Sequence, residues 1–367
     1  MHILFLNQYF PPDPAPTGVL LQELASALTA DGHEVEFVSA GQEYRGGQQR
    51  GGRMRRELSA LGRMLAAGLR AQRPDLVISA SSPPMLAVAA TAIAARHRAR
   101  SIHWIMDLYP ELAVALGEVP GGVLAKGLTG MMRLCYRRTD RVVVLDEDMA
   151  ARLRSYGVEP AIIRPWVFER LAEQSHEPAE ADEPWTWIYS GNLGRAHEWE
   201  TLLRVQAEVE RRGSDIRLLF QGGGPSWEAA QTRAGELGLR RCDWKPYVSE
   251  EELRAALLRC HCCTVTQRPA AQGLLWPSKL GLLLTLPRPL LWIGPTDGAI
   301  ARELRSVSHA GVFAPGAVGE IADWLIKQRG RPAVIDPAHL LNAADHRQSS
   351  LATWRSLIRE VLGAGEG

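Results

Sequence analysis

The sequence lacks three features that would point to other classes of protein. Its 367 residues carry a net charge of only +1, so it has no basic excess of the kind that attracts nucleic acid. No stretch approaches the ~18–20 consecutive apolar residues that a membrane-spanning helix needs. No basic leader precedes the first strand-like run, so we expect no signal peptide. These absences predict a cytoplasmic protein whose contact with a membrane, where there is one, is peripheral and on the inner face.

Cysteine is scarce, and its five copies are Cys135, Cys242, Cys260, Cys262 and Cys263. An odd number of cysteines in apolar runs suits a reducing compartment better than a disulfide framework. The run 260–263 contains three cysteines and a histidine, which invites a zinc interpretation. Zinc sites usually take ligand pairs from separated segments, however, and neighbouring strand residues point to opposite faces of a sheet. We therefore expect structural cysteines and no metal site.

Short apolar runs alternate with helix-like stretches along the chain, which predicts parallel sheets with helical crossovers. The alternation pauses once, at the acidic, proline-containing stretch 169–184, which is typical of a linker. We therefore predict two doubly wound α/β domains, at 1–168 and 185–344. A helical segment at 345–367 belongs to either domain and can pack back on the first. The expected strands are 2–6, 34–39, 76–79, 101–106, 141–145, 161–164, 186–190, 216–221, 242–245, 261–266, 289–294 and 311–314.

Glycine-containing turns follow two of the expected strands of the second domain, where parallel sheets bind their ligands. The first turn contains Ser190-Gly191-Asn192, and Arg195 comes shortly after it. Glycine lets backbone amides approach an anion, and arginine adds charge-assisted hydrogen bonds. The turn containing Gly222-Gly223 repeats the pattern with less specificity. The alternative for both turns is glycine used for backbone geometry alone.

A helix start with a lysine lies further along the second domain. In Pro277-Ser278-Lys279, proline is suited to open a helix, serine to cap it, and lysine to add positive charge beside the helix dipole. This combination predicts a diphosphate-binding site, whereas the alternative is a capped helix with a surface lysine. Asp297-Gly298 stands in another strand-to-helix turn, where the carboxylate either accepts a ribose or sugar hydroxyl or caps the helix.

Taken together, the motifs resemble the retaining glycosyltransferases of family 4, and within them a branch similar to bacterial fucosamine or fucose transferases of polysaccharide biosynthesis. The resemblance spans nearly the whole chain, and it depends more on the order and spacing of the motifs than on any one of them. The segments that carry it are 7–12, 17–18, 81–84, 107–111, 189–195, 277–279 and 294–298.

The resemblance implies a GT-B fold, in which two Rossmann-like domains face a cleft. It implies a UDP- or GDP-sugar donor, a carbohydrate or lipid-pyrophosphate-linked acceptor, retention of anomeric configuration, and neither cofactor nor metal. Thr17 and Gly18 would lie in a first-domain loop that faces the donor diphosphate. Asp107 would be a catalytic residue near the reacting sugar. Glu111, one helical turn away if the segment is helical, is the second catalytic candidate. Arg195 matches the arginine that pairs with the diphosphate in the family.

The sequence departs from the family pattern at three places. Two glutamates eight positions apart are common in the family, and here the corresponding residues are Gln272 and Leu280. The lysine that often follows the phosphate arginine is also missing, so we expect Lys279 to supply that positive charge. The missing glutamates leave the contacts with the donor hydroxyls open and keep a catalytically silent nucleotide-sugar-binding subunit as an alternative.

Two basic, amphipathic segments predict contact with an anionic membrane surface. Residues 45–73 contain eight arginines and one acidic residue; Arg56, Arg63 and Arg70 recur every seven positions. Leu58, Leu61, Leu65 and Leu69 form a stripe on the opposite side of the expected helix. Val123–Arg138 is a second candidate, apolar with a basic end. The alternative is a packed surface helix whose solvated face is basic.

Two other enzyme classes share this kind of fold. An NAD-dependent oxidoreductase would need Gly-x-Gly-x-x-Gly after the first strand, but the sequence there reads Asn7-Gln8-Tyr9-Phe10-Pro11-Pro12. A nucleotide-sugar 2-epimerase would share the donor site, yet its carboxylate and histidine cluster is not recognisable. Glycosyl transfer is therefore the preferred hypothesis.

Overall fold

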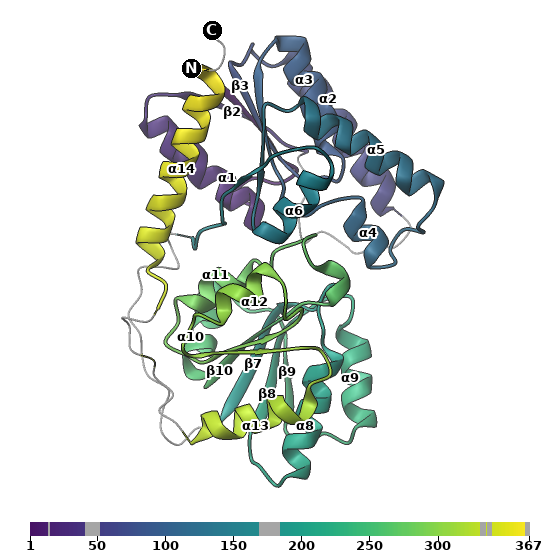
Figure 1. The fold of residues 1–367 in the computed structure, drawn as a ribbon, viewed down its shortest axis with the longest axis vertical. Coiled ribbons are helices and arrows are strands. Elements are labelled where there is room, and N and C mark those ends of the chain that lie inside the picture. Colours follow the sequence, from purple (N-terminus) through teal and green to yellow (C-terminus); the bar gives the residue numbers. More distant parts are fainter. Residues whose placement is uncertain (14, 41–51, 169–183, 331–334, 336–339, 364–367) are drawn as a thin grey trace. The chain divides into compact units, whose positions relative to one another are not determined.

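The structure, a computed structural model, describes residues 1–13, 15–40, 52–168, 184–330, 335 and 340–363. The chain divides into two compact units (Figure 1). The first comprises Met1–Phe168, Gly273–Trp276 and Asp345–Gly367, and the second comprises Glu169–Gln272 and Pro277–Ala344. The chain therefore leaves the second unit for four residues, contributes them to the first, and returns.

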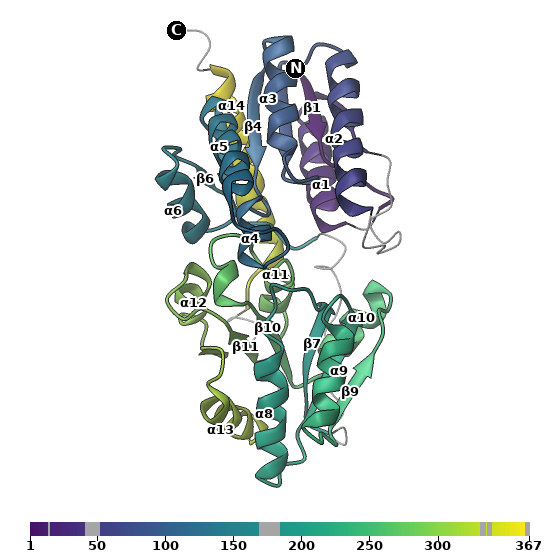
Figure 2. The ribbon, with the colours of Figure 1, turned by 90° about the vertical axis from the view of Figure 1, so that its right-hand side faces the viewer.

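The first unit is built on a six-stranded parallel sheet with the strand order β2-β1-β3-β4-β5-β6. Its strands are β1 (His2–Leu6), β2 (Glu34–Val38), β3 (Leu76–Ala80), β4 (Arg100–Trp104), β5 (Arg141–Val144) and β6 (Ala161–Ile162). Its helices are α1 (Pro16–Ala30), α2 (Arg53–Arg70), α3 (Leu86–His97), α4 (Glu111–Ala115), α5 (Val123–Arg138), α6 (Glu147–Ser155) and α14 (Ala343–Gly363). Helix α3 packs between α2 and α5 (Figure 2).

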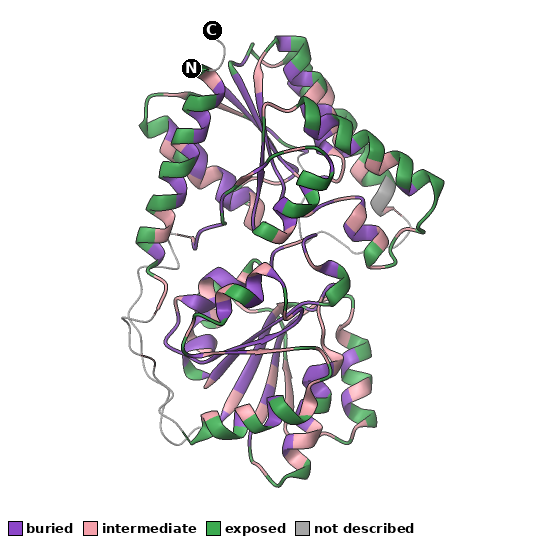
Figure 3. Ribbon diagram, viewed as in Figure 1, coloured by how far each residue is buried: buried purple, intermediate pink, exposed green. Residues whose placement is uncertain are grey.

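Burial on both faces explains why the central strands are continuous apolar runs. Every residue of β1 and β3 is buried, whereas the helices alternate buried and exposed residues (Figure 3). Helix α14 closes the unit from the far end of the chain. Its Trp354 packs edge-on against Trp104 of β4 at 4.8 Å between ring centroids, and its Arg355 forms an ion pair with Asp31 after α1.

The second unit has its own six-stranded parallel sheet, in the order β12-β11-β10-β7-β8-β9. Its strands are β7 (Thr186–Asn192), β8 (Arg217–Gly223), β9 (Cys242–Lys245), β10 (Cys262–Thr266), β11 (Leu290–Ile293) and β12 (Ala310–Phe313). Its helices are α8 (Glu200–Arg211), α9 (Trp227–Glu236), α10 (Glu250–Arg259), α11 (Lys279–Leu284), α12 (Ala299–Leu304), α13 (Val318–Arg329) and the short 3-10 helix η1 (Pro269–Ala271).

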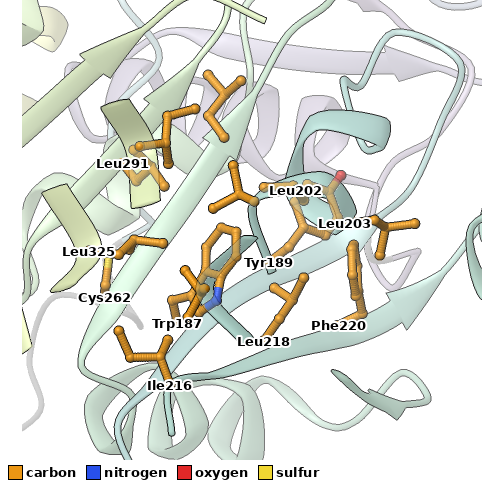
Figure 4. Close-up of a cluster of buried hydrophobic side chains, with 14 of the residues drawn as sticks. Trp187, Tyr189, Leu202, Leu203, Ile216, Leu218, Phe220, Cys262, Leu291 and Leu325 are labelled. Atoms are coloured by element: carbon orange, nitrogen blue, oxygen red, sulfur yellow. The ribbon is translucent and has the colours of Figure 1, made fainter. Parts of the chain in front are cut away.

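Large aromatic and aliphatic side chains fill the space between the second sheet and its helices (Figure 4). Trp187 and Tyr189 of β7 and Phe220 of β8 are fully buried there. The Trp187 indole N–H donates to the Gln206 side chain of α8 at 3.0 Å, so its one polar atom is satisfied in the core. This packing fixes β7 and β8, and it thereby fixes the turns at their carboxyl ends.

The predicted fold class is confirmed: all twelve expected strands are present, and both sheets are parallel. Helix α1 begins at Pro16, whose fixed φ suits the first turn of a helix. The predicted linker and the arginine-rich residues 45–51 lie outside the described residues, apart from position 184.

Candidate active site

Lys279, the first residue of α11, contacts the end of β7. The Lys279 ammonium donates a 2.7 Å hydrogen bond to the Ser190 carbonyl and lies 3.8 Å from the centroid of the Tyr189 ring. Loss of hydrating water lowers the pKa of Lys279 to about 7. Gly191 follows with φ +110°, and a side chain there would point at the ammonium, 3.6 Å from Nζ. The cation thus occupies the carboxyl edge of the sheet, the edge at which parallel sheets bind their ligands.

A histidine that no motif predicted lies beside this lysine. His197 Nδ1 donates to the Thr266 carbonyl at 3.0 Å, because a carbonyl oxygen only accepts. Burial and the neighbouring Lys279 charge lower the pKa of His197 to about 3. The imidazole is therefore neutral, and its Nε2 is a hydrogen-bond acceptor. The loop after β7 thus presents an acceptor next to a cation.

Gly222 and Gly223, the last two residues of β8, and Gly224, which follows them, allow close backbone packing. At Gly222, with φ +143°, a Cβ would lie 2.1 Å from the Gly191 carbonyl oxygen, and at Gly224 it would lie 2.3 Å from Asn192 Oδ1. At Gly223 it would lie 2.8 Å from the Tyr247 ring. The geometric explanation left open for these glycines therefore holds for Gly222. Tyr247, which is 48% exposed, is a second residue at this edge that no motif predicted.

Three of the other second-unit candidates lie at the surface of the same unit, and Gly298 is buried. The side chains of Arg195, Ser278 and Asp297 are exposed, and Gly298 is the residue immediately before α12. The expected capping role of Ser278 is wrong: its backbone is already helical, and its side chain makes no capping hydrogen bond. Helix α11 has only six residues, so Lys279 itself, rather than a long helix dipole, provides the positive potential.

In the first unit, Asp107 stands in a loop held from two sides. The Ser81 hydroxyl accepts hydrogen bonds from the Met106 and Asp107 amides, each at 3.1 Å. Asp107 pairs with Leu275 in an antiparallel bridge, and the Leu108 amide donates to the Leu274 carbonyl at 2.8 Å. Burial raises the pKa of Asp107 to about 6. The carboxyl group therefore titrates close to neutral pH, as catalytic carboxyls commonly do.

Glu111, the first residue of α4, is hydrogen-bonded to a residue at the end of α6. The Tyr156 hydroxyl, just after α6, donates to Glu111 Oε1 at 2.7 Å. Burial and the Glu111 carboxylate raise the pKa of Tyr156 to about 12, so the phenol remains a donor. Arg133 of α5 stacks over the Tyr156 ring, 4.0 Å from its centroid. Glu111 thus ties the segment after Asp107 to α5 and α6.

Gly18 does not lie in a loop, as the resemblance implied, but within the first turn of α1 beside Thr17. A Cβ at Gly18 would lie 2.6 Å from the Tyr9 carbonyl oxygen, so glycine is required for the close approach of the 9–10 backbone. The amide groups of a first helical turn have no intrahelical acceptors, so they remain suited to bind an anion.

The residues considered for zinc are engaged elsewhere. His261 stacks on Trp185, and its Nδ1 accepts from the Thr186 amide at 3.1 Å. Cys260 and Cys263 are free thiols with their sulfurs 3.6 Å apart. Within the described part of the chain, no three His, Cys, Asp or Glu side chains are arranged to hold a metal ion.

Comparison with known proteins shows which family the chain resembles. Residues 17–165 match the glycosyl transferase 4-like domain. The chain is 25% identical over 333 residues to the putative colanic acid biosynthesis glycosyl transferase WcaI of Escherichia coli K12, covering 78% of this chain and 81% of WcaI. It is 26% identical over 255 residues to the probable glycosyltransferase WbjE of Pseudomonas aeruginosa, covering 64% and 60% of the two chains.

Solved structures share the fold over nearly the whole length. HepE of Anabaena, in complex with UDP and glucose, matches with a TM-score of 0.66 and 14% identity over 99% of this chain and 100% of HepE. The apo lipopolysaccharide outer core galactosyltransferase WaaB matches with a TM-score of 0.64 and 13% identity over 96% and 99% of the two chains. At these identities the likeness shows the fold, which is the GT-B arrangement of two parallel-sheet domains.

Proposed function

Since this chain is a glycosyltransferase of the family 4 type with the GT-B fold, we propose that it transfers a sugar from a UDP- or GDP-linked donor to a polysaccharide or lipid-linked acceptor. We further propose that the anomeric configuration is retained and that no metal takes part. The descriptions of two similar proteins support this proposal. WcaI is described as a putative colanic acid biosynthesis glycosyl transferase, and HepE was crystallised in complex with UDP and glucose.

The observation that carries the proposal is the position of Lys279. Its ammonium has one hydrogen bond, to the Ser190 carbonyl, and one aromatic face, that of Tyr189, among the contacts described. A diphosphate oxygen offers a charged acceptor, which binds an ammonium more strongly than a neutral carbonyl does. Departure of a nucleoside diphosphate leaves negative charge on oxygen, and a preorganised cation stabilises that charge.

Other groups complete the proposed donor site. In the second unit, Arg195 adds a second cation beside the proposed diphosphate. In the first unit, the first-turn amides at Thr17 and Gly18 are proposed as neutral donors for an anion. Asn192, Gly223 and the turn at Asp297 and Gly298 are assigned to binding of the sugar and ribose. Gly222 shapes the backbone that carries Gly191. Ser278 offers its exposed hydroxyl beside Lys279.

Asp107 is the proposed catalytic group of the first unit. In its ionised form it would orient the acceptor or stabilise cationic character at the reacting sugar carbon. It does not act as a simple general base, because retaining chemistry in this fold is taken to occur on one face of the sugar. Glu111, with its carboxylate bonded to Tyr156, is better placed to position the Asp107 loop than to react.

A silent binding subunit remains the second candidate, because the two family glutamates are absent. Leu280, at one of these positions, is fully buried in α11, so its side chain cannot contact a bound donor. Gln272, at the other, is half-buried and ends the segment after η1. An active enzyme must therefore hold its donor sugar through other groups, which predicts an unusual sugar. A nucleotide-sugar 2-epimerase is the less favoured enzyme.

A panel of UDP- and GDP-sugars, offered with lipid-pyrophosphate and soluble carbohydrate acceptors and followed by mass spectrometry, tests the proposal. Transfer product is expected with one donor, and product lost in Asp107→Ala supports the site. Nucleotide binding is expected to survive in Asp107→Ala and to weaken in Lys279→Ala. Binding without transfer or hydrolysis across the panel would favour the silent subunit, and a 2-epimer of the donor would favour the epimerase.

A further inference from the structure

Exposed large apolar side chains gather on one helix of the first unit. Val123 and Leu124 at the start of α5 are 90% and 74% exposed, and Leu134 and Met131 are 47% and 39% exposed. Isolated surface leucines are ordinary, but a contiguous apolar patch marks an interaction site. We call these four residues the α5 apolar face.

Helix geometry places these residues together on the side of α5 that faces away from the core. The inward side carries Ala125, Met132, Cys135 and Tyr136, which are buried. Positions 123, 127, 131 and 134 are spaced by four, four and three residues, so they form one outward stripe with Leu124 beside it. Gly127 and Gly130 also open onto free space, because a Cβ at either position would have no neighbouring atom within 4 Å. The stripe therefore has no covering element among the described residues.

The charges of α5 all have one sign. The helix contains no Asp or Glu, and its cations are Lys126, Arg133, Arg137 and Arg138. All four are exposed, and they flank the apolar face or follow it at the carboxyl end. A second copy of this chain would bring the same cations together across a symmetric interface, which is unfavourable. An apolar stripe beside cations instead complements a surface that is negative outside and apolar beneath.

We infer that the α5 apolar face docks onto an anionic lipid bilayer, with the helix lying in the plane of the headgroups. The helix of 16 residues is about 24 Å long, enough for a surface contact along its length. Its leucine, methionine and valine side chains reach the acyl boundary, while the cations contact the lipid phosphates. No helix in the described part of the chain is both long and apolar enough to cross a bilayer, so the contact is peripheral.

Helix α2, the other candidate from the sequence, is less suited to this role. Its buried seam consists of Ala60 and Met64, both 0% exposed, between the arginine row and the leucine stripe. Leu61 and Leu65 pack against the core, which favours the alternative of a packed surface helix for these two residues. The Arg63 guanidinium is engaged in hydrogen bonds to the Ser59 hydroxyl and the Ala40 carbonyl. Leu58 and Leu69 alone remain exposed from the stripe.

The position of α5 also relates the docked bilayer to Asp107, the proposed catalytic residue. Helix α5 packs against α4, and Arg133 stacks on the Tyr156 ring that binds Glu111 of α4. Glu111 follows Asp107 by four residues, so a lipid-linked acceptor in the docked bilayer would lie on the side of the unit that carries Asp107. This last step rests on the proposed function, whereas the docking itself does not.

Vesicle co-sedimentation without any sugar substrate tests the docking. The full chain is expected to bind vesicles of phosphatidylglycerol and phosphatidylcholine, and to bind pure phosphatidylcholine weakly. The double variants Val123→Ser/Leu124→Ser and Met131→Ser/Leu134→Ser are each expected to lose binding by about tenfold or more. Lys126→Gln and Arg138→Gln, which leave the Tyr156 contacts intact, are expected to lose about fivefold each, an effect that fades at high salt.

The matched control is Leu58→Ser/Leu69→Ser, which removes two exposed leucines from α2. It is expected to bind vesicles like the unmodified chain, and melting temperatures check that every variant folds. Equal loss in the control, unchanged binding in the α5 variants, or a dimer that dissociates when the α5 apolar face is changed would each overturn the inference. Transfer to a soluble acceptor, measured separately, reports on the proposed function, so that the two ideas fail independently.

Discussion

The Lys279 ammonium lies 3.8 Å from the centroid of the Tyr189 ring while it donates to the Ser190 carbonyl at 2.7 Å. Both contacts come from neighbouring residues of one strand, so the cation is held in place before any donor arrives. Such preorganisation suits the proposed stabilisation of a departing diphosphate, because little rearrangement would be needed during the reaction.

The first prediction concerns the pH dependence of donor binding. The pKa of Lys279 is lowered to about 7, so the cation is present below that pH and is lost above it. We expect the affinity for UDP or GDP to be constant below pH 7 and to fall at higher pH, by about tenfold per unit at most. Calorimetric titrations between pH 6 and 9 measure this effect.

Lys279→Arg supplies the control, because arginine stays charged over this range. Its affinity is expected to be flat with pH, and Lys279→Ala is expected to reduce kcat/KM by about 10²-fold to 10³-fold. An alkaline decline that persists unchanged in Lys279→Arg would assign the titration to another group.

The second prediction concerns Asp107. Its pKa of about 6 means that the ionised form, which the proposed mechanism requires, disappears as the pH falls below 6. We expect kcat/KM to decline on the acid side with a midpoint near pH 6. Together with the Lys279 titration this predicts a narrow optimum between pH 6 and 7.

The burial that raises the pKa of Asp107 also means that its ionised form lowers the stability of the folded state. Its pKa in the unfolded chain is near the ordinary 3.8, so above pH 6 the folded state holds a carboxylate that it disfavours. Asp107→Asn is therefore expected to be inactive yet more stable at pH 7–8, by about 2 kcal/mol, and the gain should vanish as the pH falls towards 4. Urea denaturation measures it, with Asp297→Asn as the exposed-carboxylate control; a stability loss in Asp107→Asn at pH 8 would contradict the argument.

The third prediction tests the link between Tyr156 and Glu111. Tyr156→Phe keeps the ring beneath Arg133 but removes the donor to Glu111 Oε1, and the other oxygen, Oε2, is buried without a partner among the described residues. We expect a loss of about 1–3 kcal/mol in stability. If Glu111 positions the Asp107 loop, kcat should fall more than the donor KM rises.

A double-mutant cycle with Glu111→Gln separates this coupling from general damage. Tyr156→Phe removes the hydrogen bond, and Glu111→Gln weakens it by replacing the charged acceptor with an amide oxygen, so their effects on kcat should be less than additive. Fully additive effects would show that Glu111 and Tyr156 act independently.

The fourth prediction distinguishes two uses of glycine. Gly222→Ala would place a Cβ 2.1 Å from the Gly191 carbonyl oxygen at φ +143°, so we expect a cost of about 3 kcal/mol and weaker nucleotide binding. Gly235→Ala, in α9 with open space around it, should be neutral or stabilising by up to about 1 kcal/mol. Thermal unfolding compares them, and similar melting temperatures would show that the 191–222 contact can relax.

The strands could be predicted from the sequence because each is a short apolar run between polar or turn residues. The helix start at Lys279 could also be predicted from the Pro277-Ser278-Lys279 motif, although Ser278 does not cap the helix. Periodicity alone does not identify the buried side of α2. That side is the seam at Ala60 and Met64, and Gly68 allows close packing on Ile93, which is a property of the neighbouring helix α3.

Contacts between distant segments account for the rest of the site. His197 is placed in the site by its hydrogen bond to Thr266, which lies 69 residues away in the sequence. Tyr156, the hydrogen-bond partner of Glu111, is 45 residues away from it. Tyr247 belongs to no motif, because only the fold brings its ring against Gly223. Such pairings depend on strand order, and a single sequence does not encode them in any local pattern.

The four residues Gly273–Trp276 belong to the first unit, although they come late in the sequence. They supply the partners of the Asp107 and Leu108 backbone, yet the ribosome adds them more than one hundred residues after that loop. During synthesis, the Asp107 loop therefore lacks its partners at 274 and 275 until most of the second unit has been made, and the Ser81 hydroxyl is the partner available to it before then. A fragment ending at the linker would lack this closing piece and α14, so the two halves are unsuited to being exchanged between proteins as independent modules.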